Sequence, residues 1–196
     1  MKAQPRTEFC AALIAGGKSS RMGCDKRLIE IGGKPLWRRQ VEILQSLEPA
    51  ELVISGPPDG PWSEAGFRVI PDCRAGYGPL GGIASVLASV SAPWVLALAV
   101  DMPEMSGDFL RQLLCKCSNE VGVVPCTKNS FEPLAAVFPR ECGRISEEQL
   151  HSGEYSLQAF VRKCYEARLV TRIDVQKKDA HLFRNLNEPA DVECDG

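Results

Sequence analysis

Uninterrupted apolar runs alternate along the chain with segments in which apolar residues recur every three or four positions. The runs Phe9 to Ala15 and Trp94 to Val100 have the pattern of strands that are buried on both faces of a sheet. After Pro35 the apolar residues are spaced as on one face of a helix, and proline is common in the first turn of a helix. This alternation of strands and helices predicts a layered α/β fold.

The same pattern places the other elements. Short strands are predicted at residues 51–55, 67–70, 121–125, 134–138 and 167–173. Helices are predicted to begin at Pro35 and Pro189 and to occupy residues 82–90, 108–117, 140–150 and 156–164. No repeat or linker interrupts the pattern, and the richest Pro/Gly/Ser stretch, residues 55–66, is short enough for one surface loop. We therefore predict a single domain over residues 1–196.

Composition and charge fit an ordinary globular protein and exclude several classes. Of the 196 residues, 44% are hydrophobic and 24% are charged, which excludes a disordered tail, a collagen-like repeat and a coiled coil. The net charge of -2 gives no basic excess for binding nucleic acid. The longest apolar run, residues 94–100, is too short to cross a membrane, and residues 1–10 lack the apolar core of a signal peptide. We expect a cytoplasmic protein that binds neither nucleic acid nor membrane.

The nine cysteines could in principle form a metal site or disulfides. Their spacing is irregular, no C-x-x-C occurs, and the two histidines, His151 and His181, lie far apart in the sequence. A structural zinc site needs closely spaced ligand pairs. The cysteines are therefore predicted to be free thiols in a reducing compartment.

The segment after the first predicted strand combines glycines with cations. Residues 13–26 read Leu-Ile-Ala-Gly-Gly-Lys-Ser-Ser-Arg-Met-Gly-Cys-Asp-Lys. Glycine lets backbone amides approach a ligand closely, and successive amides together with lysine and arginine side chains form a site for anions. The alternative is a surface turn with solvated cations. Three glycines and three cations directly after a buried strand favour a polyphosphate site.

Two general phosphate motifs match this sequence only in part. Gly17-Lys18-Ser19 looks like the end of a P-loop, but the first glycine of that motif would fall on Ala12, in the middle of a strand. Residues 76–81 fit G-x-G-x-x-G, and Asp101 follows at the spacing of a dinucleotide fingerprint. However, residues 71–75 separate these glycines from the strand, whereas the fingerprint needs its turn at the strand end. Neither motif therefore defines the site.

Two aspartates directly follow predicted strands. Asp101 comes after the run 94–100, and Asp72 comes after residues 67–71. Ligands of open α/β sheets bind outside the carboxyl ends of the strands, and Mg²⁺ prefers carboxylate oxygens together with substrate phosphates. Either aspartate could instead be an ordinary turn residue. If the three strands are parallel, both carboxylates lie at the same sheet edge as Gly16, and Asp101 is well placed there to hold Mg²⁺.

The motif along residues 14–26 resembles the signature loop of the nucleotidyltransferases that have a nucleotide-diphospho-sugar transferase fold. Within them, the chain is most similar to the molybdenum cofactor guanylyltransferases. Further matching pieces are Gly32-Gly33-Lys34-Pro35-Leu36, Asp72 with Gly78-Pro79-Leu80-Gly81-Gly82, Asp101-Met102-Pro103 and Asn185-Leu186-Asn187-Glu188-Pro189. The resemblance implies a three-layer α/β/α, Rossmann-like fold with a mostly parallel, mixed central sheet. It also implies a nucleotide-binding half at about residues 8–105 and an acceptor-binding half at about residues 106–196.

The resemblance implies an enzyme that transfers GMP from GTP to molybdopterin, with or without bound molybdenum, and releases pyrophosphate. The terminal phosphate of molybdopterin would attack the α-phosphorus of GTP. Asp101 would hold Mg²⁺, while Arg21 and Lys26 would stabilise negative charge on the phosphates, so that catalysis works by positioning and electrostatics. Other molybdenum cofactor biosynthesis proteins and acceptor molybdoenzymes would be the protein partners.

Carried over residue by residue, the resemblance implies two sets of binding residues. The nucleotide would be bound by Ile14, Ala15, Gly16, Gly17, Lys26, Ser55, Asp72, Pro79, Leu80 and Asp101. The acceptor, molybdopterin, would be bound by Asp72, Gly82, Asn185 and Asn187. Ser55 stands where the family often has an asparagine near the base, and the asparagine pair could also form an ordinary turn.

Two other functions stay open on the sequence alone. A cytidylyltransferase of the same fold acting on molybdopterin would usually have Ala-Ala-Gly where this chain has Ala15-Gly16-Gly17, so the resemblance favours GTP. A non-catalytic nucleotide-binding partner in cofactor delivery would be expected to have lost one of the chemically active residues. Arg21, Lys26, Asp72 and Asp101 are all present, which favours an enzyme.

Overall fold

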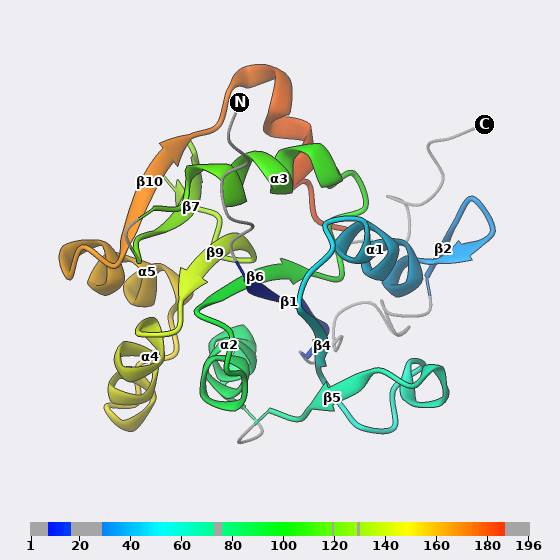
Figure 1. Cartoon of the computed structure of the whole chain (residues 1–196), viewed down its shortest axis with the longest axis horizontal. Helices are drawn as coiled ribbons and strands as arrows, with labels where there is room; N and C mark the ends of the chain where they lie inside the picture. Colours follow the sequence, from blue (N-terminus) through cyan, green and yellow to red (C-terminus); the bar gives the residue numbers. More distant parts are fainter. Residues whose placement is uncertain (1–7, 17–28, 73–75, 119, 129, 187–196) are drawn as a thin grey trace.

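The computed structural model of this chain describes residues 8–16, 29–72, 76–118, 120–128 and 130–186. A central sheet of eight strands runs through the described part (Figure 1). Its strands are β1 (Phe9–Ile14), β4 (Glu51–Ser55), β5 (Arg68–Ile70), β6 (Trp94–Ala99), β7 (Gly122–Thr127), β8 (Ser130–Phe131), β9 (Ala135–Pro139) and β10 (Val170–Asp174). The strand order is β10-β7-β9-β6-β1-β4-β5, and β8 pairs with β7 outside this path.

Most neighbouring strands in this sheet are parallel. β1 pairs in parallel with β4 and β6, β4 with β5, and β10 with β7, whereas β9 is antiparallel to β6 and β7. This confirms the predicted mixed, mostly parallel sheet. From β1 the chain moves outward to β4 and β5 and then places β6 on the other side of β1. Ligands of open α/β sheets bind at such a reversal of strand order, here between β1 and β6.

Helices cover both faces of the sheet and confirm the three-layer α/β/α fold (Figure 1). One face carries α1 (Leu36–Gln45) and α3 (Gly107–Lys116), and the other carries α2 (Gly78–Ser89), α4 (Cys142–His151) and α5 (Leu157–Glu166). The alternation of apolar side chains along β1 explains why helices pack on both faces of the sheet. Ala11 and Leu13 pack into the core beneath α1 and α3, whereas Cys10 and Ala12 pack into the core beneath α2. All four are fully buried, as in a strand covered on both sides.

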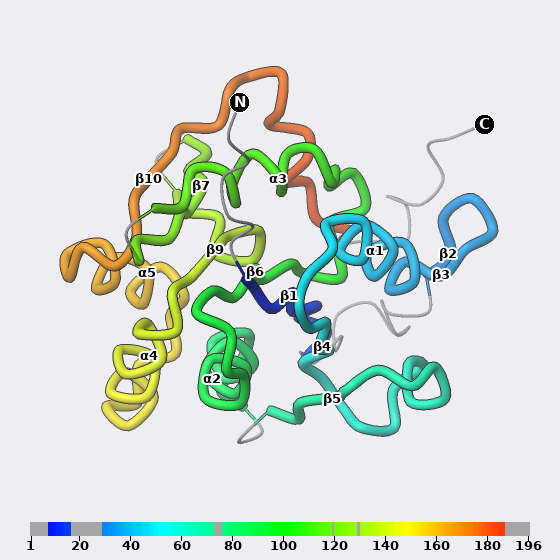
Figure 2. The backbone as a smooth tube through the Cα atoms, in the orientation of Figure 1, coloured from blue at the N-terminus to red at the C-terminus, as the bar shows by residue number. Residues whose placement is uncertain are grey.

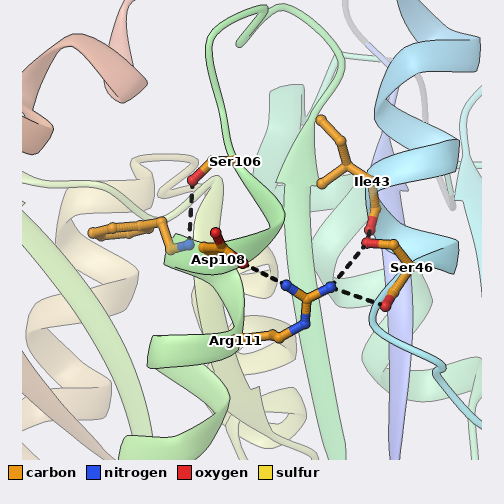
Figure 3. A network of polar contacts seen from close by, with 6 residues as sticks. Ile43, Ser46, Ser106, Asp108 and Arg111 are labelled. Carbon is orange, nitrogen blue, oxygen red and sulfur yellow. Dashed lines mark hydrogen bonds and ion pairs between the residues drawn. The ribbon is translucent and has the colours of Figure 1, made fainter.

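A polar network at the surface joins α1 to α3. The guanidinium of Arg111 donates to the main-chain oxygen of Ser46 at 3.2 Å and to Asp108 Oδ1 at 2.6 Å (Figure 3). Ser106 caps α3 by accepting a hydrogen bond from the N–H of Phe109 at 3.2 Å. The ion pair is exposed and therefore adds little stability. Together, however, the contacts fix the end of α1 beside the first turns of α3.

The last described residues lead back to the sheet edge. The 3-10 segment η3 (Lys177–Phe183) lies beside α3 (Figure 2). Phe183 packs edge-on against Phe109 of α3, with ring centroids 5.3 Å apart. Beyond it, the N–H of Leu186 donates to the main-chain oxygen of Asp101 at 3.0 Å. The C-terminal part of the described chain is thus attached next to the end of β6.

The start of α2 corrects the sequence prediction. The helix begins at Gly78 rather than at Gly82, because the run 78–82 has the composition of a loop but lies in the first turns of the helix. Pro79 is in the first turn, where its missing N–H needs no partner and its fixed φ suits the helix. Leu80 is fully buried, and its packing anchors this turn.

Several short elements were not predicted from the sequence. The strands β2 (Glu30–Ile31) and β3 (Lys34–Pro35) form a hairpin whose two glycine turn residues have positive φ, as tight hairpin turns require. The predicted surface loop 55–66 contains the 3-10 turn η2 (Ser63–Ala65). It also contributes a fully buried Trp62 to the core. The strands β2 and β3 and the turn η2 are too short to show a periodic pattern. Trp62 is buried against Trp37 of α1, which is distant in the sequence.

The cysteines that the structure describes are free, as predicted. The free cysteines of the described part are Cys10, Cys115, Cys117, Cys126, Cys142 and Cys164. Four of them are buried and pack as small apolar side chains.

Among the helices of the described ranges, none is long and apolar enough to cross a membrane. The helix predicted from Pro189 lies outside the described residues.

Candidate functional site

Four residues from four different elements meet at the carboxyl edge of the parallel strands. Gly16 follows β1, Ser55 ends β4, Asp72 follows β5 and Gly82 lies in α2. The hydroxyl of Ser55 donates to Asp72 Oδ1 at 3.2 Å. An ideal Cβ on Gly16 would lie 2.7 Å from Asp72 Oδ2, and one on Gly82 would lie 2.6 Å from Ser55 Oγ. We call these four residues the Asp72 cluster.

The two glycines of the Asp72 cluster are needed for this close approach. Real Cβ atoms essentially never come within 3.0 Å of such neighbours. Glycine at position 16 therefore lets the chain leaving β1 pass directly against the Asp72 carboxyl. Glycine at position 82 lets α2 pack against Ser55. The sequence predicted both glycines as site residues, and the structure brings them to the same carboxylate.

The carboxyl group of Asp72 lies in an unusual environment. Partial burial raises its pKa, and the hydrogen bond from Ser55 lowers the pKa by a smaller amount. Ser55 itself is fully buried, so its hydroxyl supports Asp72 from within the protein. A partly desolvated carboxylate gains free energy from any hydrogen-bond donor or cation that a ligand brings to it.

The raised pKa of Asp72 gives a testable effect on stability. Because the folded protein holds the proton of Asp72 more tightly than the unfolded chain, this group favours folding most at low pH. That contribution is lost as the pH rises through the raised folded pKa. We expect Asp72→Asn, which still accepts from Ser55, to raise the Tm of the ligand-free protein at about pH 7.5 and to have little effect near about pH 3.5. Thermal denaturation at both pH values measures this, and a lowered Tm at neutral pH would contradict it.

Asp101 lies at the other side of β1 from the Asp72 cluster. It is half-buried in the turn that follows β6, and β6 lies next to β1. The N–H of Val100 donates to the main-chain oxygen of Ile14 at 3.1 Å, and the main-chain oxygen of Asp101 accepts from Leu186. Asn185, which precedes Leu186, is exposed. The structure thereby brings the first half of the predicted NxNxP element next to the aspartate.

A fully buried glutamine supports the turn that carries Asp101. Gln40 Nε2 on α1 donates to the main-chain oxygen of Met102 at 2.6 Å. Gln40 was not predicted from the sequence as a site residue. A signal was nevertheless present, because Gln40 occupies the apolar face of α1 with Trp37 and Leu44. A polar residue at such a position has to find an internal partner.

The donor chemistry at this edge fits a magnesium ion. In the described part of the chain, no group of three or more His, Cys, Asp or Glu side chains forms a ready-made metal site. Mg²⁺ usually binds through one or two carboxylates together with substrate phosphates and water, not through a full protein cage. A half-buried aspartate at a strand end is therefore suitable, and Asp101 is the residue that would hold the ion.

The other predicted nucleotide residues lie along the same edge. Ile14 and Ala15 have buried side chains, so contact with a ligand would come from their backbone, and the N–H of Ala15 already donates to the main-chain oxygen of Ser55 at 2.8 Å. Pro79 is half-buried and Leu80 is fully buried in the first turn of α2. The side chain of Leu80 therefore serves the core.

Part of the predicted site is not covered by the structure. Gly17, Arg21, Lys26 and Asn187 lie outside the described residues, so their roles stay predictions. These residues include both predicted catalytic cations. The described part supplies the carboxylates and glycines of the site.

The fold and this edge define the chain as an α/β protein with acidic residues and glycines at the switch point of a mostly parallel sheet, a usual place for nucleotides. The sequence model of the family described as "MobA-like NTP transferase domain" matches residues 11–170. The chain belongs to this family and is a nucleotidyltransferase.

Curated relatives match the chain over nearly its whole length. A "Probable molybdenum cofactor guanylyltransferase" of Opitutus terrae is 32% identical over 186 residues, covering 93% of this chain and 92% of the relative. A protein of the same name from Pelotomaculum thermopropionicum is 33% identical over 185 residues, covering 92% of this chain and 88% of the relative.

Solved structures confirm the fold. The Aq1419 protein of Aquifex aeolicus has a TM-score of 0.77 at 22% identity, and the comparison covers 94% of this chain and 95% of that one. Molybdopterin-guanine dinucleotide biosynthesis protein A of Archaeoglobus fulgidus has a TM-score of 0.71 at 22% identity, with the same coverage. At this identity the likeness concerns the fold alone.

Proposed function

We propose that this enzyme transfers GMP from GTP to molybdopterin, with or without bound molybdenum, and so forms molybdopterin guanine dinucleotide and pyrophosphate. The observation that carries the proposal is the similarity to proteins named molybdenum cofactor guanylyltransferase, at 32% identity over 93% of the chain. The Asp72 cluster and Asp101 support it, because they lie on either side of β1 where the strand order reverses. The product would then pass to acceptor molybdoenzymes.

The proposed reaction is a phosphoryl transfer without a protein nucleophile. An oxygen of the terminal phosphate of molybdopterin bonds to the α-phosphorus of GTP. The bond from that phosphorus to the oxygen that bridges to the β-phosphate breaks, and pyrophosphate leaves. The protein contributes by positioning the two phosphates and by stabilising their charge.

Each group of residues has a part in this proposal. The glycine loop from Gly16 onward would bind the phosphates through backbone N–H groups. Arg21 and Lys26 would stabilise negative charge on the reacting and leaving phosphates. Asp72 would meet both substrates where they join, and Asn185 with Asn187 would bind the acceptor.

Asp101 would hold Mg²⁺ in the working enzyme. The ion would neutralise triphosphate charge and help pyrophosphate to leave. The turn around Asp101 is fixed by Gln40 Nε2 on the oxygen of Met102 and by the N–H of Leu186. This support keeps the carboxylate in place before any substrate arrives.

Pyrophosphate release tests the proposal directly. The full chain is incubated without oxygen with Mg²⁺, molybdopterin and one of GTP, CTP, ATP or UTP, and the pterin product is identified by its mass. We expect pyrophosphate only when nucleotide and acceptor are both present, and the GMP adduct as the main product. Release with CTP alone among the nucleotides would make the chain a cytidylyltransferase. No release with any nucleotide would contradict an enzymatic role on molybdopterin.

A further inference from the structure

A bulge interrupts the sheet next to the strand that leads to Asp101. β8 and β9 both pair with β7, with Phe131 opposite Cys126 and Val137 opposite Val123. Between these pairs the β8–β9 side has the five residues 132–136, whereas β7 has only residues 124 and 125. Glu132 still faces Pro125 in the ladder, and the extra residues form a turn at 133–134 directly after it. Bulges of this kind redirect side chains and are frequent beside active sites.

The bulge lies at the carboxyl end of β6. The main-chain oxygen of Leu134 accepts from the N–H of Ala99 at 2.8 Å, two positions before Asp101. Because β9 and β1 flank β6 on opposite sides, the bulge lies on the side of Asp101 away from the Asp72 cluster. By its place in the sequence, Glu132 also belongs to the half of the chain, about residues 106–196, that is proposed to bind the acceptor.

The backbone of Glu132 is held firmly. Its N–H donates to the main-chain oxygen of Pro125 at 2.8 Å, and its carbonyl accepts from the N–H of Ala135 at 3.2 Å. The neighbouring Phe131 is clamped by Gln158 of α5, whose Oε1 accepts from the Phe131 N–H at 3.1 Å and whose Nε2 donates to the Phe131 carbonyl at 2.8 Å. These hydrogen bonds fix the backbone from which the Glu132 side chain extends.

The carboxylate of Glu132 has an internal donor. Its Oε1 accepts a hydrogen bond from the hydroxyl of Thr127 at the end of β7. The side chain is half-buried, and burial raises its pKa more than the Thr127 hydroxyl lowers it. No ion pair within the described ranges involves Glu132. A carboxylate that is partly desolvated and oriented by a hydroxyl is suited to accept hydrogen bonds from a ligand.

We infer that Glu132 binds the 2-amino-4-oxopyrimidine edge of the acceptor's pterin. That edge presents a ring N–H and an amino group side by side, and a carboxylate offers two acceptor oxygens and no donor. Guanine carries the same edge, so the chemistry alone fits both substrates. Asn185, proposed for the acceptor, is attached at the same end of β6 through the N–H of Leu186 on the main-chain oxygen of Asp101, and this assigns Glu132 to the pterin. The inference rests on the proposed function, since it takes molybdopterin as the acceptor.

Glu132→Gln tests this assignment. Glutamine keeps the size of the side chain and an oxygen for Thr127 but replaces the second acceptor oxygen with a donor. We expect the KM for molybdopterin to rise about tenfold to hundredfold, while the KM for GTP stays near its wild-type value and the Tm does not fall. Glu166→Gln, at the exposed end of α5, removes the same charge and should change neither KM. Thr127→Val removes only the supporting hydroxyl and should raise the KM for molybdopterin by a smaller factor.

A binding measurement without turnover separates recognition of the pterin by Glu132 from a purely structural role of this residue. Fluorescence titrations compare 6-hydroxymethylpterin with 6-hydroxymethyllumazine, which has an oxygen in place of the 2-amino group. The wild type should bind the pterin more tightly, and Glu132→Gln should lose or reverse that preference, because its amide can donate to the oxygen of lumazine.

Different outcomes identify different failures. A raised KM for GTP in Glu132→Gln, with the KM for molybdopterin unchanged, would move the residue to the guanine and overturn the inference. An unchanged preference for pterin over lumazine would also overturn it. If the wild type transfers GMP to no molybdopterin acceptor, the proposed function fails, and the titrations still decide whether Glu132 selects a pterin.

Discussion

Asp101→Asn is expected to lower kcat for GMP transfer by about 10³-fold or more, since loss of the proposed metal ligand would remove several kcal/mol of charge stabilisation in the transition state. The fold should survive, because Leu186 and Gln40 fix the turn through the main-chain oxygens of Asp101 and Met102. Asparagine keeps that backbone and the size of the side chain, but it removes the charge and replaces one acceptor oxygen with a donor.

Steady-state kinetics over a range of Mg²⁺ concentrations measures this effect. Asp59→Asn, at an exposed position of the loop after β4, is the matched control and should retain wild-type kinetics. If Asp101→Asn kept full turnover with an unchanged Mg²⁺ requirement, the metal role of Asp101 would be wrong.

Gly82→Ala is expected to reduce kcat/KM by about 10²-fold, the scale of a 1 Å displacement at a catalytic site. The new Cβ would lie 2.6 Å from Ser55 Oγ and 3.2 Å from Asp72 Oδ1. Ser55 is fully buried and has little room to move, so its hydrogen bond to Asp72 would be disturbed. Alanine also favours the helix by about 1 kcal/mol over glycine, so the Tm should fall much less than the activity.

A control substitution at a second helical glycine separates the effect of Gly82→Ala on the site from the effect of alanine on helix stability. Gly143→Ala, in α4, would place its Cβ 3.5 Å from Leu87 Cβ, which is an ordinary contact. It should leave kcat/KM unchanged and preserve or raise the Tm. Equal activity of Gly82→Ala and wild type would show that the Asp72 cluster tolerates displacement and is not part of the catalytic site.

The strands β1 and β6 were predicted well because they are buried on both faces. The runs from Phe9 and from Trp94 match β1 and β6 within one residue, since continuous apolar runs leave little choice of structure. The start of α2 was missed because glycine and proline usually mark loops. There the packing of Leu80 and the tolerance for proline in a first turn decided the structure instead.

Only the part of the site that lies directly at strand ends could be predicted from the sequence. Asp72, Asp101 and Gly16 follow strands, so their common edge was foreseeable. The hydrogen bond from Ser55 to Asp72 was not, because it depends on how closely β4, β5 and α2 approach one another. Glu132 was also missed, because a bulge in a strand leaves no periodic signal in the sequence.

Nucleotide choice decides between a guanylyltransferase and its alternatives. Calorimetric titration of the full chain with GTP, CTP, ATP and UTP in the presence of Mg²⁺ gives the four Kd values under one set of conditions. We expect GTP to bind tightest, by about tenfold or more over CTP, which corresponds to at least one discriminating hydrogen bond. Equal or tighter binding of CTP would contradict a guanylyltransferase, and binding of none of the four would contradict the nucleotide site itself.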